Sequence, residues 1–363
     1  MSNEPIFSPL LHFGSGLPLE SLENVRDNLS AIVLDGDHLW LGGDEGTAIH
    51  RMTRDATGNF SGHTSFELKD ILGLPGKVED EIDIEGLDVD GGYLWLVGSH
   101  SAKRKKPDTG KDLEDNLKRL RKIELEGNRL TLARVPLGKA ATPVRSHGGL
   151  SAARLVGDTK SNLLTDALMS DCHLGRFVPR VKTKGGVEGI PSKDNGLDVE
   201  GLAVMGDRVF LGLRGPVLRG WATIIELKVK EDDKGVLALE TLASSGKPYL
   251  KHLLQLDGLS VRELAFNGND LLVLSGPSMD LDGPVFIYRW KNALHQQADS
   301  MTWKDELTKV VTVPFGLSKD HAEGLSIVTA DPLSVMVCYD SPATSRISGN
   351  SVKVDVFAIS SLP

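Results

Sequence analysis

The sequence predicts an all-β protein, a β-propeller of five or six four-stranded blades. The main observation is a repeated unit: Glu-Gly-Leu, a short apolar run, a tight turn and a second apolar run. A unit that recurs every several tens of residues is typical of repeat architectures. The copies are residues 85–98 (EGLDVDGGYLWLVG), 200–212 (EGLAVMGDRVFLG), 263–274 (ELAFNGNDLLVL), 323–328 (EGLSIV) and, with Ser30 in place of the acid, 30–42 (SAIVLDGDHLWLG).

Further strand-like segments follow each copy, which is the second observation. We expect strands over residues 120–125 and 130–135, 222–229 and 236–242, and 285–290 and 308–313. Several short strands bounded by Gly, Asp and Asn turns indicate a sandwich, a barrel or a propeller. Four strands per repeat in meander order favour the propeller, in which each repeat is one blade. The 39 glycines supply the many tight turns that such a fold needs.

The blades are expected to start near residues 30, 85, 200, 263 and 323, within a single propeller domain covering 1–363. The corresponding spacings are 55, 115, 63 and 60. The longest gap predicts either a degenerate sixth blade or a partly helical insertion around residues 136–195, with a helix over 161–171 capped by Ser161. After Glu323 only one more strand pair is visible, at 334–338 and 352–359. We therefore expect residues 6–13 to complete the last blade and close the ring.

A second insertion covers residues 99–118 and is basic first and mixed in charge afterwards. It is interpreted either as a solvated loop leading into a short helix, or as a lid or anion-binding loop over one end of the channel.

Composition excludes several classes of protein. The net charge of -9 argues against nucleic-acid binding, which requires a surplus of Lys and Arg. Residues 1–20 lack the features of a signal peptide, and no apolar run reaches the length of a membrane span, so we expect a cytoplasmic protein without a membrane partner. With only Cys172 and Cys338, reduced thiols are expected rather than a disulfide framework.

The candidate metal ligands are the acids that open the inner strands. In a propeller the first strand of each blade lines the central channel, so these acids would converge although they are far apart in sequence. Clustered carboxylates require protonation or a cation, and oxygen-only ligands suit Ca²⁺ or Mg²⁺. Three alternatives remain open: pairing with arginines, hydrogen bonds to backbone amides of the neighbouring blade, or direct acid-base catalysis by the acids themselves. The acids are Glu85, Glu200, Glu263 and Glu323, and the arginines are Arg214, Arg219 and Arg262.

Other candidate residues lie near the same end of the predicted channel. His100 follows the second strand of its blade, and His321 lies two residues before Glu323, so either histidine could move protons or bind a metal. Arg214 and Arg219 could bind an anion. The sequence has no G-x-S-x-G elbow, no H-E-x-x-H pair, no Walker A loop and no zinc-type cysteine spacing, which argues against the common nucleophilic, zinc and nucleotide-hydrolysing enzymes.

Four motifs carry a resemblance to a known family, of which the two longer ones are the more specific: 85–87 (EGL), 98–101 (GSHS), 193–202 (KDNGLDVEGL) and 212–222 (GLRGPVLRGWA). With these, the chain resembles the bacterial proteins of domain-of-unknown-function family 3616 over roughly residues 30–359. The resemblance implies a propeller-like fold and no specific reaction. Through the Glu-Gly-Leu element alone, the chain is also distantly similar to phytase-type esterase-like propellers, which implies a calcium-dependent phosphatase or esterase. Ser30 departs from that pattern and would remove one ligand.

Two functional hypotheses follow. In the first, the channel mouth binds a small anionic ligand or a protein partner, with Ca²⁺ as a cofactor. In the second, the same mouth is a metal-dependent hydrolase of phosphate or carboxylic esters, in which the inner glutamates hold the ion. The lack of a recognisable nucleophile favours binding.

Overall fold

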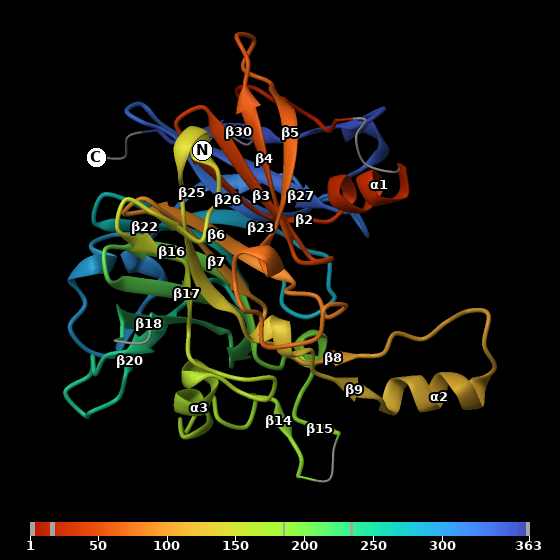
Figure 1. Cartoon of the computed structure of the whole chain (residues 1–363), viewed down its shortest axis with the longest axis vertical. Helices are drawn as coiled ribbons and strands as arrows, with labels where there is room; N and C mark the ends of the chain where they lie inside the picture. The colour runs from red at the N-terminus through yellow and green to blue at the C-terminus, as the bar shows by residue number, and fades with distance from the viewer. Residues whose placement is uncertain (1–3, 15–18, 184–185, 233–234, 361–363) are drawn as a thin grey trace.

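Five sheets, each with its first strand at the centre, build the computed structural model, which describes residues 4–14, 19–183, 186–232 and 235–360. Each inner strand contacts the next, and the fifth contacts the first. The ring therefore closes with five blades, and the predicted all-β propeller is confirmed (Figure 1). In ring order the inner strands are β2 (Leu29–Asp35), β6 (Ile84–Asp90), β16 (Asp198–Met205), β21 (Ser260–Asn267) and β26 (His321–Ala330).

The outer strands follow the inner ones in antiparallel order, as a meander requires. The first blade adds β3 (His38–Gly43), β4 (Ala48–Arg54) and β5 (Phe60–Glu67), and the second adds β7 (Tyr93–Gly98), β10 (Leu132–Pro136) and β13 (Ala153–Arg154). The third adds β17 (Arg208–Leu218), β18 (Trp221–Glu231) and β20 (Tyr249–Leu254), with β19 (Leu237–Leu239) paired on β18. At the edge of this sheet, β24 (Ser300–Thr302) pairs parallel with β20; it comes from a later part of the chain and is not part of the meander. The fourth adds β22 (Asp270–Gly276), β23 (Val285–Trp290) and β25 (Leu307–Val313), and the fifth adds β27 (Leu333–Asp340) and β30 (Asp355–Ala358).

The prediction that residues 6–13 complete the fifth blade holds only in part: Phe7 pairs with that blade, whereas residues 10–12 belong to the sheet of the first blade. Phe7 bridges Val356 of β30, and its carbonyl accepts a hydrogen bond of 2.8 Å from the Val356 amide. Strand β1 (Leu10–His12) then lies between β5 and β29 (Ser351–Lys353), which itself pairs with β28 (Ile347–Ser348). Helix α1 (Leu19–Asp27) leads from this clasp into the first blade. The outer edge of the first blade is thereby paired instead of left open.

Two strand predictions hold only in part. Residues 120–125 form the end of helix α2 (Leu113–Arg121) and the short strand β9 (Ile123–Glu124), which pairs with β8 (Lys103–Arg104). Asp112 caps α2, and the helix has acidic residues in its first turn and basic residues in its last, so its local sequence favours a helix without burial. Residues 103–124 thus form an arm that projects from the sheets in Figure 1, whereas residues 99–102 are buried. Residues 236–242 contain β19, but the fourth strand of that blade is β20.

The long gap between the second and third inner strands contains no sixth blade, because β6 contacts β16 directly. Its residues form the hairpins β11 (Ser146–His147) with β12 (Leu150–Ser151) and β14 (Arg180–Val181) with β15 (Val187–Glu188), together with helix α3 (Leu163–Met169). The predicted helix is observed, but Asn162 caps it instead of Ser161, through a capping box with Thr165.

The core consists of five apolar clusters, each located between two neighbouring blades. Trp40 and Leu87 share the cluster between the first two blades, for example, and Phe210 and Leu264 share the one between the third and fourth. Strand β7 lies between two such clusters and is apolar and buried at every position. Cys172 and Cys338 are free thiols. Among the described residues, none of the helices combines the length and the apolar character needed to cross a membrane.

A substitution at Gly86 tests whether the inner strands of neighbouring blades lie in close contact. A Cβ at this position would lie 2.6 Å from the Cβ and 2.9 Å from the backbone nitrogen of Leu202 in the next blade. We expect Gly86→Ala to lower the free energy of unfolding by about 1–3 kcal/mol, because overpacking forces the strands apart. Urea unfolding measures this loss. Gly73→Ala is the control, since nothing lies within 4 Å of its added Cβ; equal stability of the two variants would contradict this packing.

Candidate functional site

A cavity of about 1040 Å³ opens at the end of the channel where the inner strands begin. It is lined by residues of all five blades and by the base of the arm. Among the described lining residues, Asp and Glu outnumber Lys and Arg, so the cavity carries an excess of negative charge. Such a concentration of charged groups from distant segments makes it the candidate site.

In four of the five blades, the residue at the same structural position lines this cavity. Near its start, each inner strand skips a residue in its pairing with the second strand, and we call the skipped residue the bulge position. In the fifth blade both Glu323 and Gly324 are skipped. A bulge re-aims a side chain, which explains why these residues leave the sheet surface. In ring order the bulge positions hold Ser30, Glu85, Glu200, Arg262 and Glu323.

Glu263 therefore does not correspond to the other three acids, which departs from the sequence prediction. It lies one residue after the bulge position and does not line the cavity. Its Oε1 accepts hydrogen bonds from the backbone amides of Leu202 (2.8 Å) and Leu264 (2.9 Å). Burial raises the pKa of Glu263 well above its usual range. For this residue, the alternative of a hydrogen bond to the neighbouring blade is what the structure shows.

Two arginines neutralise one side of the cavity floor. Arg214 Nη1 lies 2.7 Å from Glu200 Oε1, and Arg214 Nη2 lies 2.5 Å from Asp198 Oδ2. Arg262 Nε lies 3.0 Å from the other oxygen of Glu200, and the same guanidinium pairs with Glu323. Burial raises the pKa of Glu200 to about 6, although both arginines oppose the shift. Glu200 is thus held between two guanidinium groups and has no need of a metal.

The other side of the floor has no such compensation. Asp44, from the loop between β3 and β4, and Glu85 form no hydrogen bond and no ion pair within the described part of the chain. Glu85 is nevertheless only 7% exposed. Burial raises the pKa of both carboxyl groups well above the usual range, and the negative charges of Asp83 and Glu323, among others, raise it further. These groups are either protonated or await a cation.

Asp44, Glu85 and Glu323 form a compact set of oxygen ligands. One carboxylate oxygen of each lies within 4.8 Å of one oxygen of the others. Opposite ligands of a Ca²⁺ ion, at Ca–O distances of about 2.4 Å, are separated by a comparable length. Two observations make the set fit a cation: Asp44 Oδ1 is buried without a hydrogen-bond partner, and Glu85, only 7% exposed, has an unpaired carboxylate. An acid without a partner is costly to bury.

Of the predicted residues His321, Arg219 and His100, only His321 lines the cavity. His321 lines the cavity, with Nε2 at 3.0 Å from Asp282 Oδ1 and Nδ1 at 3.6 Å from Asp340 Oδ2. Its hydrogen bonds to Asp340 and Asp282 raise its pKa, which favours a proton donor over a base. Arg219 lies in the turn between β17 and β18, is exposed and does not line the cavity.

His100 is fully buried away from the cavity. Its Nδ1 donates to the Gly98 carbonyl (2.7 Å), and its Nε2 accepts from the Asn162 amide (2.8 Å). Burial lowers its pKa to about 4, so the ring is neutral at pH 7 and is fully used in joining the arm region to α3.

Asp83, Asp198 and Arg129 also belong to the floor, and the sequence prediction did not include them. Asp83 pairs with the buried Arg129, and Asp198 pairs with Arg214. The two acids could have been found in the sequence. Asp83 and Asp198 each stand two residues before a bulge-position acid, Glu85 and Glu200 respectively. Asp83 lies directly before β6 and Asp198 is the first residue of β16, so both lie at the end of the channel where the bulge-position acids lie.

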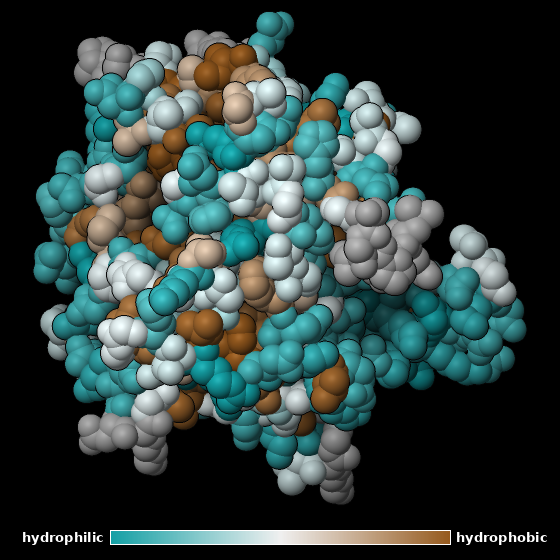
Figure 2. Space-filling view, turned by 45° about the horizontal axis from the view of Figure 1, so that its top comes forward, coloured by the Kyte–Doolittle hydropathy of each residue, from teal (hydrophilic) through white to brown (hydrophobic). Residues whose placement is uncertain are grey.

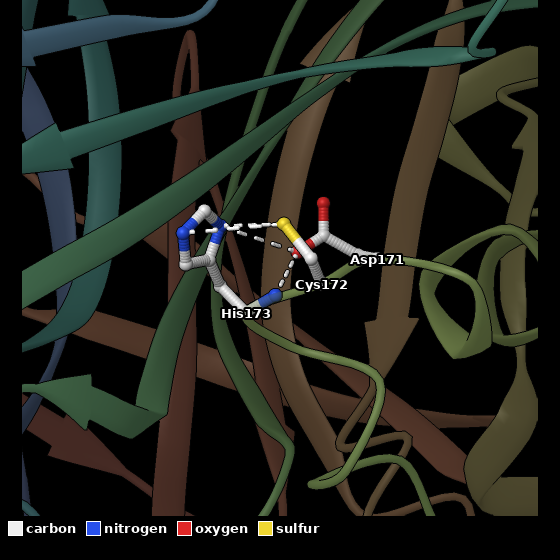
Figure 3. A group of neighbouring side chains, drawn as sticks. All are labelled: Asp171, Cys172 and His173. Atoms are coloured by element: carbon white, nitrogen blue, oxygen red, sulfur yellow. Dashed lines mark hydrogen bonds and ion pairs between the residues drawn. The ribbon is translucent and has the colours of Figure 1, made fainter.

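A second group of potential ligands, Asp171, Cys172 and His173, lies elsewhere and is drawn in Figure 3. Asp171 accepts hydrogen bonds from Lys251 Nζ and Tyr249 Oη, each at 2.8 Å, and from two backbone amides. Although burial opposes it, these bonds lower the pKa of Asp171. Its oxygens are thus occupied by protein donors, and the group is better explained as a structural contact.

The chain belongs to the family described as a protein of unknown function (DUF3616), whose profile matches residues 28–356. Among solved structures, the chain is similar to a glutaminyl cyclase from Myxococcus xanthus, with 9% identity, coverage of 98% of this chain and 100% of that one, and a TM-score of 0.39. It is also similar to a streptogramin B lyase, with 11% identity, coverage of 98% and 100%, and a TM-score of 0.37. A third is a calcium-binding protein, regucalcin, from Agrobacterium tumefaciens, with 8% identity, coverage of 93% and 92%, and a TM-score of 0.36. No curated protein matches the chain.

Glu263→Gln and Glu263→Ala test the structural role of this acid. The amide side chain retains an oxygen that can accept from Leu202 and Leu264, so the free energy of unfolding should change by less than about 1 kcal/mol. Truncation leaves two buried amides without a partner and should cost about 1–3 kcal/mol. Chemical unfolding of both variants checks this. A similar large loss in both variants would show that the ionised acid itself is required.

Proposed function

We propose that this protein binds a small anionic ligand at the channel mouth through a divalent cation, with Asp44, Glu85 and Glu323 holding Ca²⁺. The proposal is supported by the buried Asp44 Oδ1, which has no hydrogen-bond partner, beside the unpaired carboxylate of the largely buried Glu85. The set differs from the four glutamates expected from the sequence, because Glu200 is neutralised by two arginines and Glu263 lies outside the cavity.

The net negative charge of the cavity favours binding of a cation, which can then bind an anionic ligand. The lining acids outnumber the lining bases, so an anion alone would meet net repulsion. A divalent ion at Asp44 and Glu85 would satisfy the unpaired acids and leave coordination positions toward the open cavity. Ca²⁺ takes six to eight oxygen ligands, more than three carboxylates supply when each binds through one oxygen. The remaining positions are where a carboxylate or phosphate of the ligand would bind.

A hydrolase at the same mouth is the second candidate, and the observation in its favour is His321. This imidazole lines the cavity two residues before Glu323, and Asp282 and Asp340 raise its pKa, so it can donate a proton to a leaving group. The cation would polarise the ester or phosphoryl oxygen. Arg214 does not serve as a free anion clamp, since Asp198 and Glu200 already engage it.

Metal binding is tested with the thermal midpoint of unfolding. At a hundredfold excess of Ca²⁺ over its Kd, binding should stabilise the wild type by about 2.7 kcal/mol. The Asp44→Asn, Glu85→Gln double variant should show no response to Ca²⁺. Glu263→Gln is the matched control, since it removes a buried inner-strand acid outside the cavity and should respond as the wild type does. A wild type indifferent to Ca²⁺, Mg²⁺ and Mn²⁺ would refute the proposal.

The raised pKa values of Glu200 and Glu85 predict that the free energy of unfolding of the metal-free protein depends on pH. A carboxyl group with a raised folded-state pKa stabilises the fold at low pH, and this contribution is lost as pH rises through the folded-state value. For Glu200 the loss falls between about pH 4.5 and pH 6 and is on the order of 2 kcal/mol. Glu85 should continue the loss to higher pH, because its pKa is raised further.

This dependence is best measured as a difference between variants. Burial lowers the pKa of His50 and His100, which acts in the opposite sense and hides the slope in the wild type alone. Subtracting the free energy of unfolding of Glu85→Gln from that of the wild type should give a difference that falls with rising pH. Saturating Ca²⁺ should abolish the fall. A flat difference would show that Glu85 ionises without cost.

The hydrolase is tested with p-nitrophenyl phosphate and p-nitrophenyl acetate in the presence of Ca²⁺. If the mouth only binds its ligand, the wild type produces no p-nitrophenol above the background rate. Calcium-dependent turnover that His321→Asn reduces at least tenfold would favour the hydrolase over the binding protein.

A further inference from the structure

The cavity has an apolar rim above its charged floor. Leu120 of α2, Leu281 in the loop between β22 and β23, and Phe315 in the loop between β25 and β26 all line it. They are 39%, 60% and 45% exposed, respectively. Single exposed apolar residues are common, and on the face drawn in Figure 2 hydrophobic residues form small groups among hydrophilic ones. These three differ because separate segments bring them to one cavity.

Hydrogen bonds hold this rim in position. Asp282 accepts from the backbone amide of Ser318 (3.0 Å) and from His321, which joins the loop of Leu281 to the loop of Phe315. At the base of the arm, Arg104 donates to the Leu120 carbonyl and to Asp194, and Arg119 donates to the Lys106 carbonyl (2.7 Å). The apolar side chains are therefore exposed on ordered segments. The fold keeps them in water although this exposure is unfavourable.

The arm also contributes positive charge to the same wall. Lys105 and Lys106 line the cavity and form no ion pair within the described residues. From floor to rim, the cavity thus presents a cation site, unpaired lysines and apolar side chains. Its volume of about 1040 Å³ greatly exceeds the space that an ion with a small inorganic anion would occupy.

From this arrangement we infer that the ligand of the channel mouth is an amphipathic anion: a carboxylate or phosphate head group joined to an apolar chain. The head group binds at the cation and the lysines, and the chain lies against Leu120, Leu281 and Phe315. This inference rests on the proposed function for the position of the head group. The apolar rim is an independent observation, so the two can fail separately.

The test compares ligands that differ only in chain length, by isothermal titration of the Ca²⁺-loaded full chain. The probes are butyl and octyl phosphate, and butyrate and octanoate, all kept below their micelle concentrations. Burial of one methylene contributes about 0.8 kcal/mol, so affinity should rise up to about fourfold for each added methylene that reaches the rim. The two head groups distinguish a phosphate ligand from a carboxylate ligand.

The Leu281→Ser, Phe315→Ser double variant should bind the short and long chains with similar affinity, while its Ca²⁺ affinity stays that of the wild type. The control is Leu113→Ser, Leu317→Ser. These two leucines are each 76% exposed, lie on the same helix and loop as the rim residues, and do not line the cavity. This control should keep the full dependence on chain length.

Three results would overturn the inference: equal affinity for short and long chains in the wild type, an unchanged chain-length dependence in the rim variant, or binding to anionic vesicles without binding to the soluble probes. If Ca²⁺ still binds in these cases, the proposed function survives and only the apolar part is wrong. Chain-length dependence without any Ca²⁺ requirement would instead refute the cation site and leave the rim intact.

Discussion

The contact between neighbouring inner strands is the constraint on which the rest of the structure depends. Gly86 allows β6 to lie against Leu202 of β16, and Glu263 binds the amide of the same leucine from the other side. Five such contacts close the ring, and an apolar cluster fills each wedge between blades. Because the inner strands lie close together around the channel axis, the first residues of all five blades are also close together. Charged residues that are distant in sequence therefore become neighbours.

The electrostatics of the floor follow from which residue occupies each bulge position. Arg262 in the fourth blade takes the place of an acid and pairs with the acids of the third and fifth blades, while Arg214 neutralises Glu200 and Asp198. Ser30 in the first blade brings no charge, and its hydroxyl donates to the carbonyl of Ile84 in the next blade. The uncompensated negative charge is therefore confined to the side of Asp44 and Glu85, which is where a cation would be most stabilised.

Much of the fold could be read from the sequence, since each hairpin turn fixes the period of its blade. The apolar pattern did not locate the bulge position of the fourth blade. Glu263 directly follows Arg262 and was therefore aligned with the glutamates of the other copies, although Arg262 holds the bulge position. Counting back from the turn gives the correct residue: Ser30, Glu85, Glu200 and Arg262 each stand five positions before the last paired residue of their strand. His100 and Arg219 were misplaced because a loop residue adjacent to a strand end can turn either into the core or out to solvent.

By itself, the sequence determined the repeat, the blades and the presence of acids at the starts of inner strands, because these depend on local periodicity and turn chemistry. Only the tertiary structure decided which acids are neutralised and which remain open, since an ion pair between blades requires side chains that are more than sixty residues apart in the chain, such as Arg262 and Glu200. The same holds for the rim, where Leu120, Leu281 and Phe315 acquire a common role only after ring closure brings their segments to one cavity. Burial and distance set the charge state of a carboxylate, and neither is encoded in its immediate neighbours.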